Sequence, residues 1–238
     1  MAQLPGWMPI LLDRIQWGCS TSPWFVNLAD ESKIYDTGKA ICKELWPFIR
    51  ELPTNIAFVR DAIPENAENL QAARNLLGQL SDDERKYQQL FLKQCYFAGV
   101  SEEELCKMTP TVDAEELCDA MRRMCRESDY VDGVHAIVAA EFAATLYSRA
   151  ALPIYENFFQ KNHEYTKEQV DDGLEWLRLH AKTHTRHAIW MKRMLGDIED
   201  SSENEIPRAA ELLLNCVLKL WQCPPEESKQ AAAAIITS

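Results

Sequence analysis

The chain has 238 residues, of which 47% are hydrophobic, and its formal net charge is −12 at pH 7. This length and composition are typical of a globular protein with a sizeable core and exclude a disordered chain. An acidic surface repels nucleic-acid phosphates and anionic lipid, so we expect neither nucleic acid nor a membrane as a partner.

The first residues, MAQLPGWMPILLDRIQW, have no basic region before a short apolar run that Pro5 and Pro9 interrupt. This predicts that they are not a signal peptide, and no later run reaches membrane-spanning length, so we expect a cytoplasmic protein. The eight cysteines include no CxxC pair and lie among apolar residues. We interpret them as buried free thiols in a reducing compartment, not as disulfides or a zinc site.

Apolar residues recur at helical spacing almost throughout, and only eight residues are Gly, which predicts an all-α protein. The first predicted helices cover residues 9–17, 33–52 with a bend at Pro47, and 54–62. Ser81 and Glu84 then form a capping box, S-x-x-E, inside a helical stretch that ends at Gly99. Either a helix begins again at Ser81, or one long helix continues with the box unused.

A second capping box, Ser101 with Glu104, predicts a short helix in SEEELCKM. Later helices are predicted over 113–127, over 130–159 with a kink at Pro153, from Thr166 to about residue 194, and from Pro207 to Pro224. No repeat or flexible linker divides the chain. We therefore predict one all-α domain over residues 1–238, a single compact bundle of about eight to nine helices with a frayed tail over 229–238.

Three of the five histidines fall within HAKTHTRH, as His180, His184 and His187. The i, i+4, i+7 spacing places them within about 60° of arc on one face of a helix. Neutral imidazole is a preferred ligand of iron, zinc and copper. One straight helix cannot easily bring all three to one ion, so two metals, or one metal with a supporting histidine, fit better. The alternative is a half-exposed polar stripe without chemistry.

A metal site needs ligands from further helices, and Glu141 in the apolar run IVAAEFAATLY is the first candidate. A carboxylate there is costly unless it is paired or bound to a metal; the alternative is an edge position facing water. Other candidates are Arg149 and Glu156 on the same predicted helix, and Gln79, Asp82, Asp83, Glu84 and Tyr87 between residues 75 and 100.

The segments NLLGQLSDDERKYQQLFLKQCYFAGVSEEEL, LYSRAALPIYENFF and EWLRLHAKTHTRHAIWMKRML together resemble the heme-oxygenase-like superfamily. This superfamily includes TenA, PqqC, the CADD-like proteins and related iron-containing oxidases, and the CADD-like group resembles this chain most. The resemblance covers roughly residues 70–195. It implies a compact helical bundle with a central small-molecule pocket, in which diiron members activate dioxygen to oxidise or cleave small substrates.

Carried over position by position, the family's last ligand run falls on His180, His184 and His187, with His184 where the family usually has Asp. Glu141 is the expected carboxylate partner. The leading prediction is therefore a di-iron type oxidoreductase, with iron as cofactor, that acts on a small polar metabolite.

The same alignment places Gln79, Tyr87 and Arg149 where the family has other metal ligands. One explanation is an alignment shifted by a turn, so that Glu141 and one of Asp82, Asp83 or Glu84 complete the metal site. The other is loss of the dimetal centre, as in the metal-free PqqC-like members.

In the metal-free alternative, the chain is an enzyme or a small-ligand-binding protein without a cofactor. Tyr87, Arg149 and the histidines would then serve proton transfer and anion binding. A third hypothesis is a non-catalytic protein that docks a partner through its acidic surface. A homodimer is also compatible with the sequence.

Overall fold

A computed structural model describes residues 5–162, 164–182, 186–198 and 205–223. Within these ranges the chain forms helices and no strand, which confirms the predicted all-α class. The helices are α1 (Met8–Thr21), α2 (Pro23–Ala29), α3 (Ile34–Ala62), η1 (Glu68–Leu70, 3₁₀), α4 (Gln71–Phe97), α5 (Glu102–Lys107), α6 (Val112–Arg122), η2 (Arg123–Glu127, π), α7 (Tyr130–Lys161), α8 (Lys167–Gly173), α9 (Glu175–Lys182), α10 (Arg186–Ile198) and α11 (Arg208–Gln222). Eleven α-helices in the described ranges slightly exceed the eight to nine predicted.

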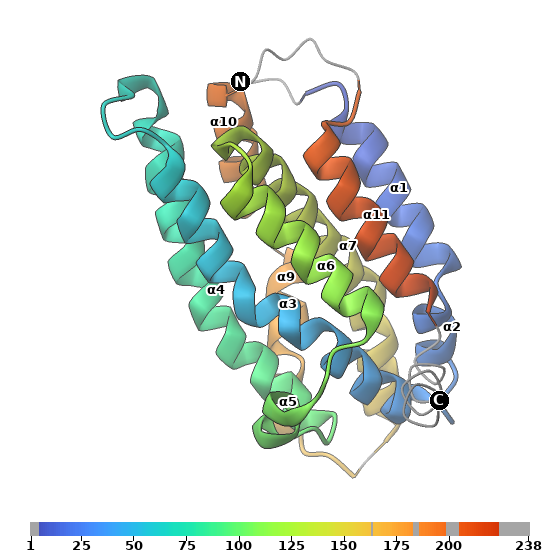
Figure 1. The fold of residues 1–238 in the computed structure, drawn as a ribbon. Helices are drawn as coiled ribbons and strands as arrows, with labels where there is room; N and C mark the ends of the chain where they lie inside the picture. The colour runs from blue at the N-terminus through green and yellow to red at the C-terminus, as the bar shows by residue number, and fades with distance from the viewer. Residues whose placement is uncertain (1–4, 163, 183–185, 199–204, 224–238) are drawn as a thin grey trace, which may run out of the picture.

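The helices form a bundle around α7 (Figure 1). α7 packs against α1, α2, α3, α9, α10 and α11, so it contributes to most of the core. α3 pairs most extensively with α4, and α11 lies between α1 and α6. The bundle centre is therefore enclosed by α3, α4, α6, α7, α9 and α11.

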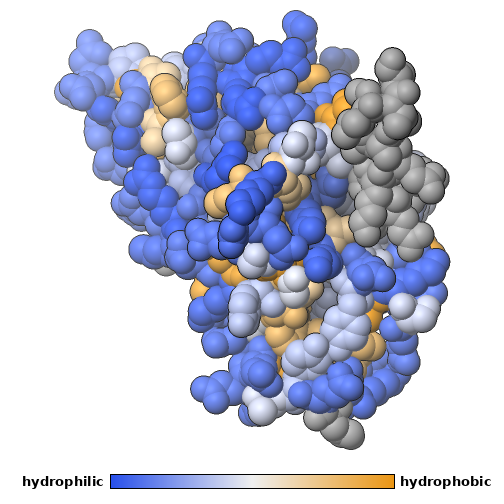
Figure 2. Space-filling view, turned by 60° about the horizontal axis from the view of Figure 1, so that its bottom comes forward, coloured by the Kyte–Doolittle hydropathy of each residue, from blue (hydrophilic) through white to orange (hydrophobic). Residues whose placement is uncertain are grey.

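One helix in the described ranges, α7, is long and apolar enough to cross a membrane by length and composition. The prediction that no run reaches that length was therefore wrong. However, 61% of its apolar window is buried inside the bundle, which is typical of the core helix of a soluble protein. The molecular face shown in Figure 2 is mainly hydrophilic, with hydrophobic residues visible in small areas.

The eight cysteines are all free, as predicted, and six of them are buried. Cys106 and Cys223 are exposed, which corrects the expectation that every thiol is buried. Burial raises the pKa of the Cys19 and Cys125 thiols to about 12, so these two stay protonated at neutral pH.

α3 is one continuous helix, although the sequence predicted two helices separated near Pro53. Pro47 and Pro53 both lie inside it. An internal proline removes one backbone donor and normally kinks or ends a helix, so the continuation of α3 needs compensation from outside the helix.

At Pro53, the neighbouring α4 supplies this compensation. Pro53 has no N–H, so the carbonyl of Ile49 loses its intrahelical donor. The side-chain amide Nε2 of Gln88 donates to the Ile49 oxygen at 3.0 Å. The hydroxyl of Ser81 donates to the Pro53 carbonyl oxygen at 2.8 Å. Side chains of α4 thus hydrogen-bond to the α3 backbone on both sides of the proline.

Of the two capping boxes considered between residues 81 and 104, one forms and the other does not. Ser101 and Glu104 form a complete box at the start of α5, which confirms that prediction. Ser81 and Glu84 lie inside the uninterrupted α4, so of the two alternatives the long helix with an unused box is the observed one. α4 ends before Gly99, whose positive φ of 77° reverses the chain direction as predicted.

The helix predicted from Thr166 to about residue 194 is divided into α8, α9 and α10. The capping box of Thr166 and Gln169 opens α8 as expected. α8 ends at Gly173, where a Cβ atom would lie 2.3 Å from the Phe97 ring, so only glycine permits this approach of α8 to α4. Leu174 then leaves helical geometry (φ −105°, ψ 4°). The sequence pattern did not predict this interruption of the helix.

We expect Gln88→Met to lower the free energy of unfolding by about 1–3 kcal/mol, because the Ile49 carbonyl would lose its donor. Pro53→Ala restores a backbone N–H that can bond to this carbonyl. The loss caused by Gln88→Met should therefore be about 1 kcal/mol smaller in the Pro53→Ala background. Urea denaturation of the wild type, both single variants and the double variant measures this coupling. An equal loss in both backgrounds would show that Gln88 does not compensate for the proline.

Candidate functional site

A cavity lies at the centre of the bundle, where six helices meet. Its volume is about 60 Å³, and since one enclosed water needs about 10–15 Å³, it has room for several waters or a small organic molecule. Its walls are mainly apolar and aromatic, and include Phe48, Leu52, Tyr147, Trp176, Val217 and Trp221. Such an apolar pocket with a few polar groups is the usual form of a small-molecule site.

Three residues with ionisable carboxyl or imidazole groups line this cavity, and each comes from a different helix. Glu84 belongs to α4, Glu141 to α7 and His180 to α9. Their exposed fractions are only 4%, 6% and 2%. The fold therefore brings two carboxyls and one imidazole out of contact with bulk water and onto one apolar cavity.

Glu84 has the most unusual environment of the three. Its Oε1 atom is buried and accepts no hydrogen bond from the described residues. Burial raises the pKa of Glu84 well above its usual range, and the neighbouring carboxyls of Glu141 and Asp83 raise it further. Two carboxyls this close in an apolar site do not both ionise readily, so Glu84 retains a proton at pH values where an exposed glutamate is charged.

Glu141 lies in the apolar part of α7, where the sequence placed it as a metal ligand or as an edge residue facing water. It is buried and faces the cavity, so the second of these alternatives does not apply. Its side chain lies close enough to Glu84 to influence the pKa of that residue. Its assignment as a metal ligand stays a prediction.

The ring of His180 has a defined orientation. Its Nδ1 atom lies 2.9 Å from the backbone oxygen of Trp176, one helical turn earlier. Because a carbonyl only accepts, Nδ1 carries the hydrogen in this bond. In the neutral ring Nε2 is then the nitrogen that can accept a proton or bind a metal. The ring also packs on Trp176, with 4.1 Å between ring centroids.

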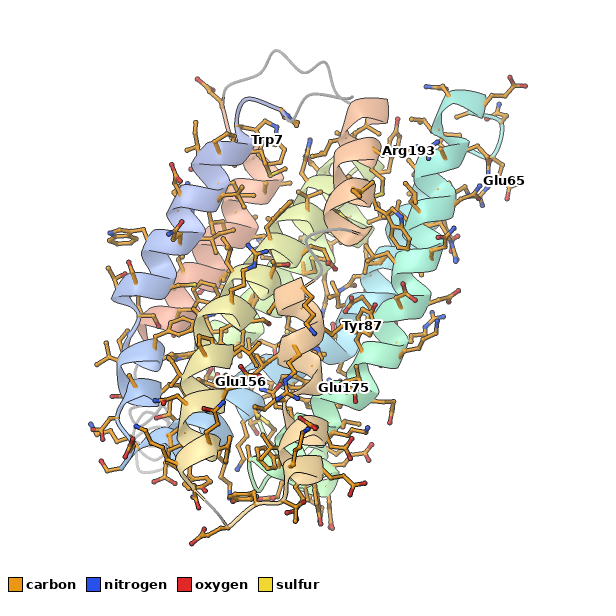
Figure 3. The ribbon with its side chains drawn as sticks, turned by 180° about the vertical axis from the view of Figure 1, so that it is seen from behind. Trp7, Glu65, Tyr87, Glu156, Glu175 and Arg193 are labelled. Carbon is orange, nitrogen blue, oxygen red and sulfur yellow. The ribbon has the colours of Figure 1, made fainter. Side chains whose placement is uncertain are left out.

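Tyr87 and Arg149, the two predicted catalytic residues, lie next to His180 but are not among the residues that line the cavity. The Tyr87 ring contacts the His180 ring edge to face, with centroids 5.5 Å apart, and Figure 3 shows Tyr87 between α4 and α9. The Nε atom of Arg149 donates to the Ala181 carbonyl oxygen at 3.2 Å, near the end of α9. Their catalytic roles stay predictions.

The other two histidines of the predicted stripe cannot be placed in this cavity. His184 lies outside the described residues, and so does the side chain of His187. The backbone of His187 belongs to α10, whereas His180 belongs to α9. The predicted metal-binding roles of His184 and His187 therefore stay predictions.

The alignment that placed the first family glutamate on Gln79 does not match the structure. Gln79 is exposed and borders a surface depression, and it does not line the central cavity. Among the alternatives, Asp82 is exposed, and Asp83 pairs with Lys86 at 3.2 Å. Glu84 is the one that faces the cavity.

Ion pairs hold α9, which carries His180, on both of its sides. Arg178 of α9 pairs with Glu156 of α7 at 2.9 Å. Lys93 of α4 lies 3.4 Å from Glu175, at the start of α9. Figure 3 shows Glu156 and Glu175 on these two sides. Each such half-exposed pair contributes little stability, about 0–1 kcal/mol, but together they fix the position of α9 between its neighbours.

The metal prediction can be tested against the donor groups themselves. In the described part of the chain, no three His, Cys, Asp or Glu side chains are close enough together to hold one ion. Glu84, Glu141 and His180 share a cavity but do not form such a group. The described residues alone therefore do not supply a complete dimetal centre, and two of the predicted ligands, His184 and the side chain of His187, lie outside them.

Sequence reasoning underestimated Glu84 and missed the aromatic wall of Tyr147, Trp176 and Trp221. A signal for Glu84 was present, because it lies seven residues after Leu77 and seven before Phe91, on the apolar face of α4. The capping-box pattern hid this periodicity. No sequence signal marked which aromatic residues would meet at the cavity.

No protein-family model matches the sequence, and no curated protein matches it. Solved structures do match. A TenA homolog from Pseudomonas syringae pv. tomato has a TM-score of 0.72 at 14% identity, over 95% of this chain and 94% of that chain. A domain of unknown function with a heme oxygenase-like fold, from Shewanella denitrificans, has a TM-score of 0.71 at 13% identity, over 95% and 92%.

A CADD-like protein of unknown function from Nostoc punctiforme matches more weakly, with a TM-score of 0.52 at 10% identity, over 94% of this chain and 96% of that chain. All three matches extend over nearly the whole of both chains, so the likeness concerns the entire bundle. At these identities the likeness concerns the fold and carries no activity. The chain therefore has the heme-oxygenase-like fold, as its sequence resemblance predicted.

Proposed function

We propose that the protein is an enzyme that binds a small molecule in the central cavity and acts on it by proton transfer. The observation that carries this proposal is Glu84, a buried carboxyl with an unpartnered oxygen that lines an otherwise apolar cavity. An unpaired polar atom of this kind costs stability, about 1–3 kcal/mol, and such groups are concentrated at functional sites.

The carboxyl of Glu84 and the imidazole of His180 suit opposite roles in proton transfer. Glu84, with its raised pKa, can hold a proton near neutral pH and donate it as a general acid. His180, whose Nδ1 is bound to a carbonyl, can accept a proton at Nε2 as a general base. The neighbouring carboxyl of Glu141 raises the pKa of Glu84 and so favours its protonated form. The apolar walls suit a substrate that is small and partly apolar.

A metal-dependent oxidase is the second candidate. Two carboxyls and an imidazole from three helices are the ligand types that iron uses in helical bundles. Since the described residues do not assemble a complete site, we derive no step that involves iron. Under either candidate we retain the expectations of a cytoplasmic protein, a small-molecule substrate and no binding to nucleic acid or membrane. The homodimer also stays a prediction.

The raised pKa of Glu84 makes stability depend on pH. The folded protein keeps the Glu84 proton at pH values where the unfolded chain, with a glutamate pKa of about 4.3, has released it. The contribution of Glu84 is thus intact below the unfolded pKa and is lost as pH rises through the raised folded pKa.

Glu84→Gln removes this titration. We therefore expect the free energy of unfolding of Glu84→Gln to rise relative to the wild type between pH 5 and pH 8, by up to about 1.4 kcal/mol per pH unit. Urea denaturation in the presence of EDTA measures it. Asp82→Asn, which removes an exposed carboxylate of the same helix, should follow the wild type. A difference between Glu84→Gln and wild type that stays constant with pH would contradict the assignment.

Catalysis can be tested without knowing the substrate. Incubating the protein with a small-molecule extract of cells should lower the signal of one compound and raise that of another in mass spectrometry. Glu84→Gln should slow this conversion by about 10²–10⁴-fold, because the general acid is lost, whereas Asp82→Asn should behave like the wild type. Equal conversion by the wild type and Glu84→Gln would rule out an acid role for Glu84.

Elemental analysis separates the two candidates. The oxidase requires about one or more iron atoms per chain in protein purified without a histidine tag, and Glu141→Gln should reduce that content. The proton-transfer enzyme should give the same conversion of the extract after treatment with a chelator. Conversion that stops with the chelator and returns only with iron would favour the oxidase.

A further inference from the structure

Three buried polar atoms on the central cavity have no hydrogen-bond partner among the described residues. They are Oε1 of Glu84, the hydroxyl oxygen of Tyr147 and Nε1 of Trp176. All three residues line the cavity and are at most 4% exposed. Buried polar groups in native proteins are nearly always paired, so a bound molecule or ordered water is expected to complete them.

The charge of the cavity favours one sign of ligand. Glu84 and Glu141 line it, whereas no Lys or Arg lines it in the described part of the chain. The nearest predicted cation, Arg149, donates to the Ala181 carbonyl instead. In an apolar environment charge interactions are strong, so a cation gains from this site and an anion is disfavoured.

The aromatic walls favour the same sign. The ring centroid of Tyr147 lies 6.5 Å from that of Trp176 and 6.2 Å from that of Trp221. The faces of Trp and Tyr rings attract organic cations, most strongly where water is excluded. Leu52 and Val217 complete an apolar wall for the rest of the molecule.

We infer that the cavity binds a small organic amine in its ammonium form. The carboxyl of Glu141 faces the charged nitrogen, the unpartnered Oε1 of Glu84 accepts one of its N–H groups, and the aromatic rings enclose the apolar part. Aliphatic amines are protonated at pH 7, as the lysine side chain is with its pKa of about 10.4. This inference rests on the proposed function, because it names the substrate class of the same cavity.

Three probes of similar size and different charge test it: benzylamine, benzyl alcohol and benzoate. Isothermal titration calorimetry of the whole chain at pH 7 should give benzylamine an affinity at least about tenfold higher than that of benzyl alcohol. Benzoate should bind more weakly than either. Benzyl alcohol binding as well as benzylamine, or benzoate binding best, would overturn the amine inference and leave the cavity as a small-molecule site. Failure of all three probes to bind would overturn it as well.

Variants locate the binding. Glu141→Gln should lower the affinity for benzylamine by at least about tenfold and leave that for benzyl alcohol within about threefold, whereas Glu84→Gln replaces a protonated carboxyl by a neutral amide and should change neither by more than about threefold. Asp82→Asn should change neither. Circular dichroism verifies folding, and the wild-type ranking of the probes decides the inference even if one variant does not fold. Unchanged benzylamine affinity in folded Glu141→Gln would contradict it. Amine binding without conversion of the cell extract would reject catalysis and leave the amine inference standing.

Discussion

The burial of the Glu84 carboxyl in an apolar cavity is the constraint on which the rest of the site depends. A carboxyl there is stable only if its helix is held firmly and its proton is retained. Burial and the neighbouring carboxyls retain the proton, and the same face of α4 that carries Glu84 holds the helix. Ser81 and Gln88, three residues before and four after Glu84, hydrogen-bond to the α3 backbone around Pro53. The contacts that let α3 continue through its proline thus also fix the direction of Glu84.

The imidazole of His180 is positioned by a different set of contacts, those of α9. α9 begins just after the chain leaves helical geometry at Leu174, and ion pairs link it to α4 and α7. The break at Leu174 allows α9 to take a direction different from that of α8, and His180 of α9 lines the cavity together with Glu84. Tyr87 packs on the His180 ring from the α4 side and limits its rotation. The acid and the base of the proposed reaction are therefore held by separate helices.

The sequence predicted the features that depend on local pattern. Helical periodicity gave the all-α class, the box at Ser101 gave the start of α5, and the apolar surroundings of Glu141 marked it as unusual. Features that depend on a neighbouring helix were not predictable. The continuity of α3 requires Gln88 of another helix, and the box at Ser81 is unused because its hydroxyl bonds to Pro53. The end of α8 depends on the fit of Gly173 against Phe97. The histidine spacing identified His180, but only the fold joined it to Glu84.

The protonation state of Glu84 at neutral pH is the measurement that tests this account most directly. Infrared difference spectroscopy of the wild type against Glu84→Gln, without metal or ligand, distinguishes the C=O band of a protonated carboxyl from the bands of a carboxylate. The account predicts that the wild type has a protonated carboxyl band at pH 7 and that Glu84→Gln lacks it. Identical carboxyl bands in the two proteins, or loss of carboxylate bands alone in the variant, would mean that Glu84 is ionised and is not the acid of the site.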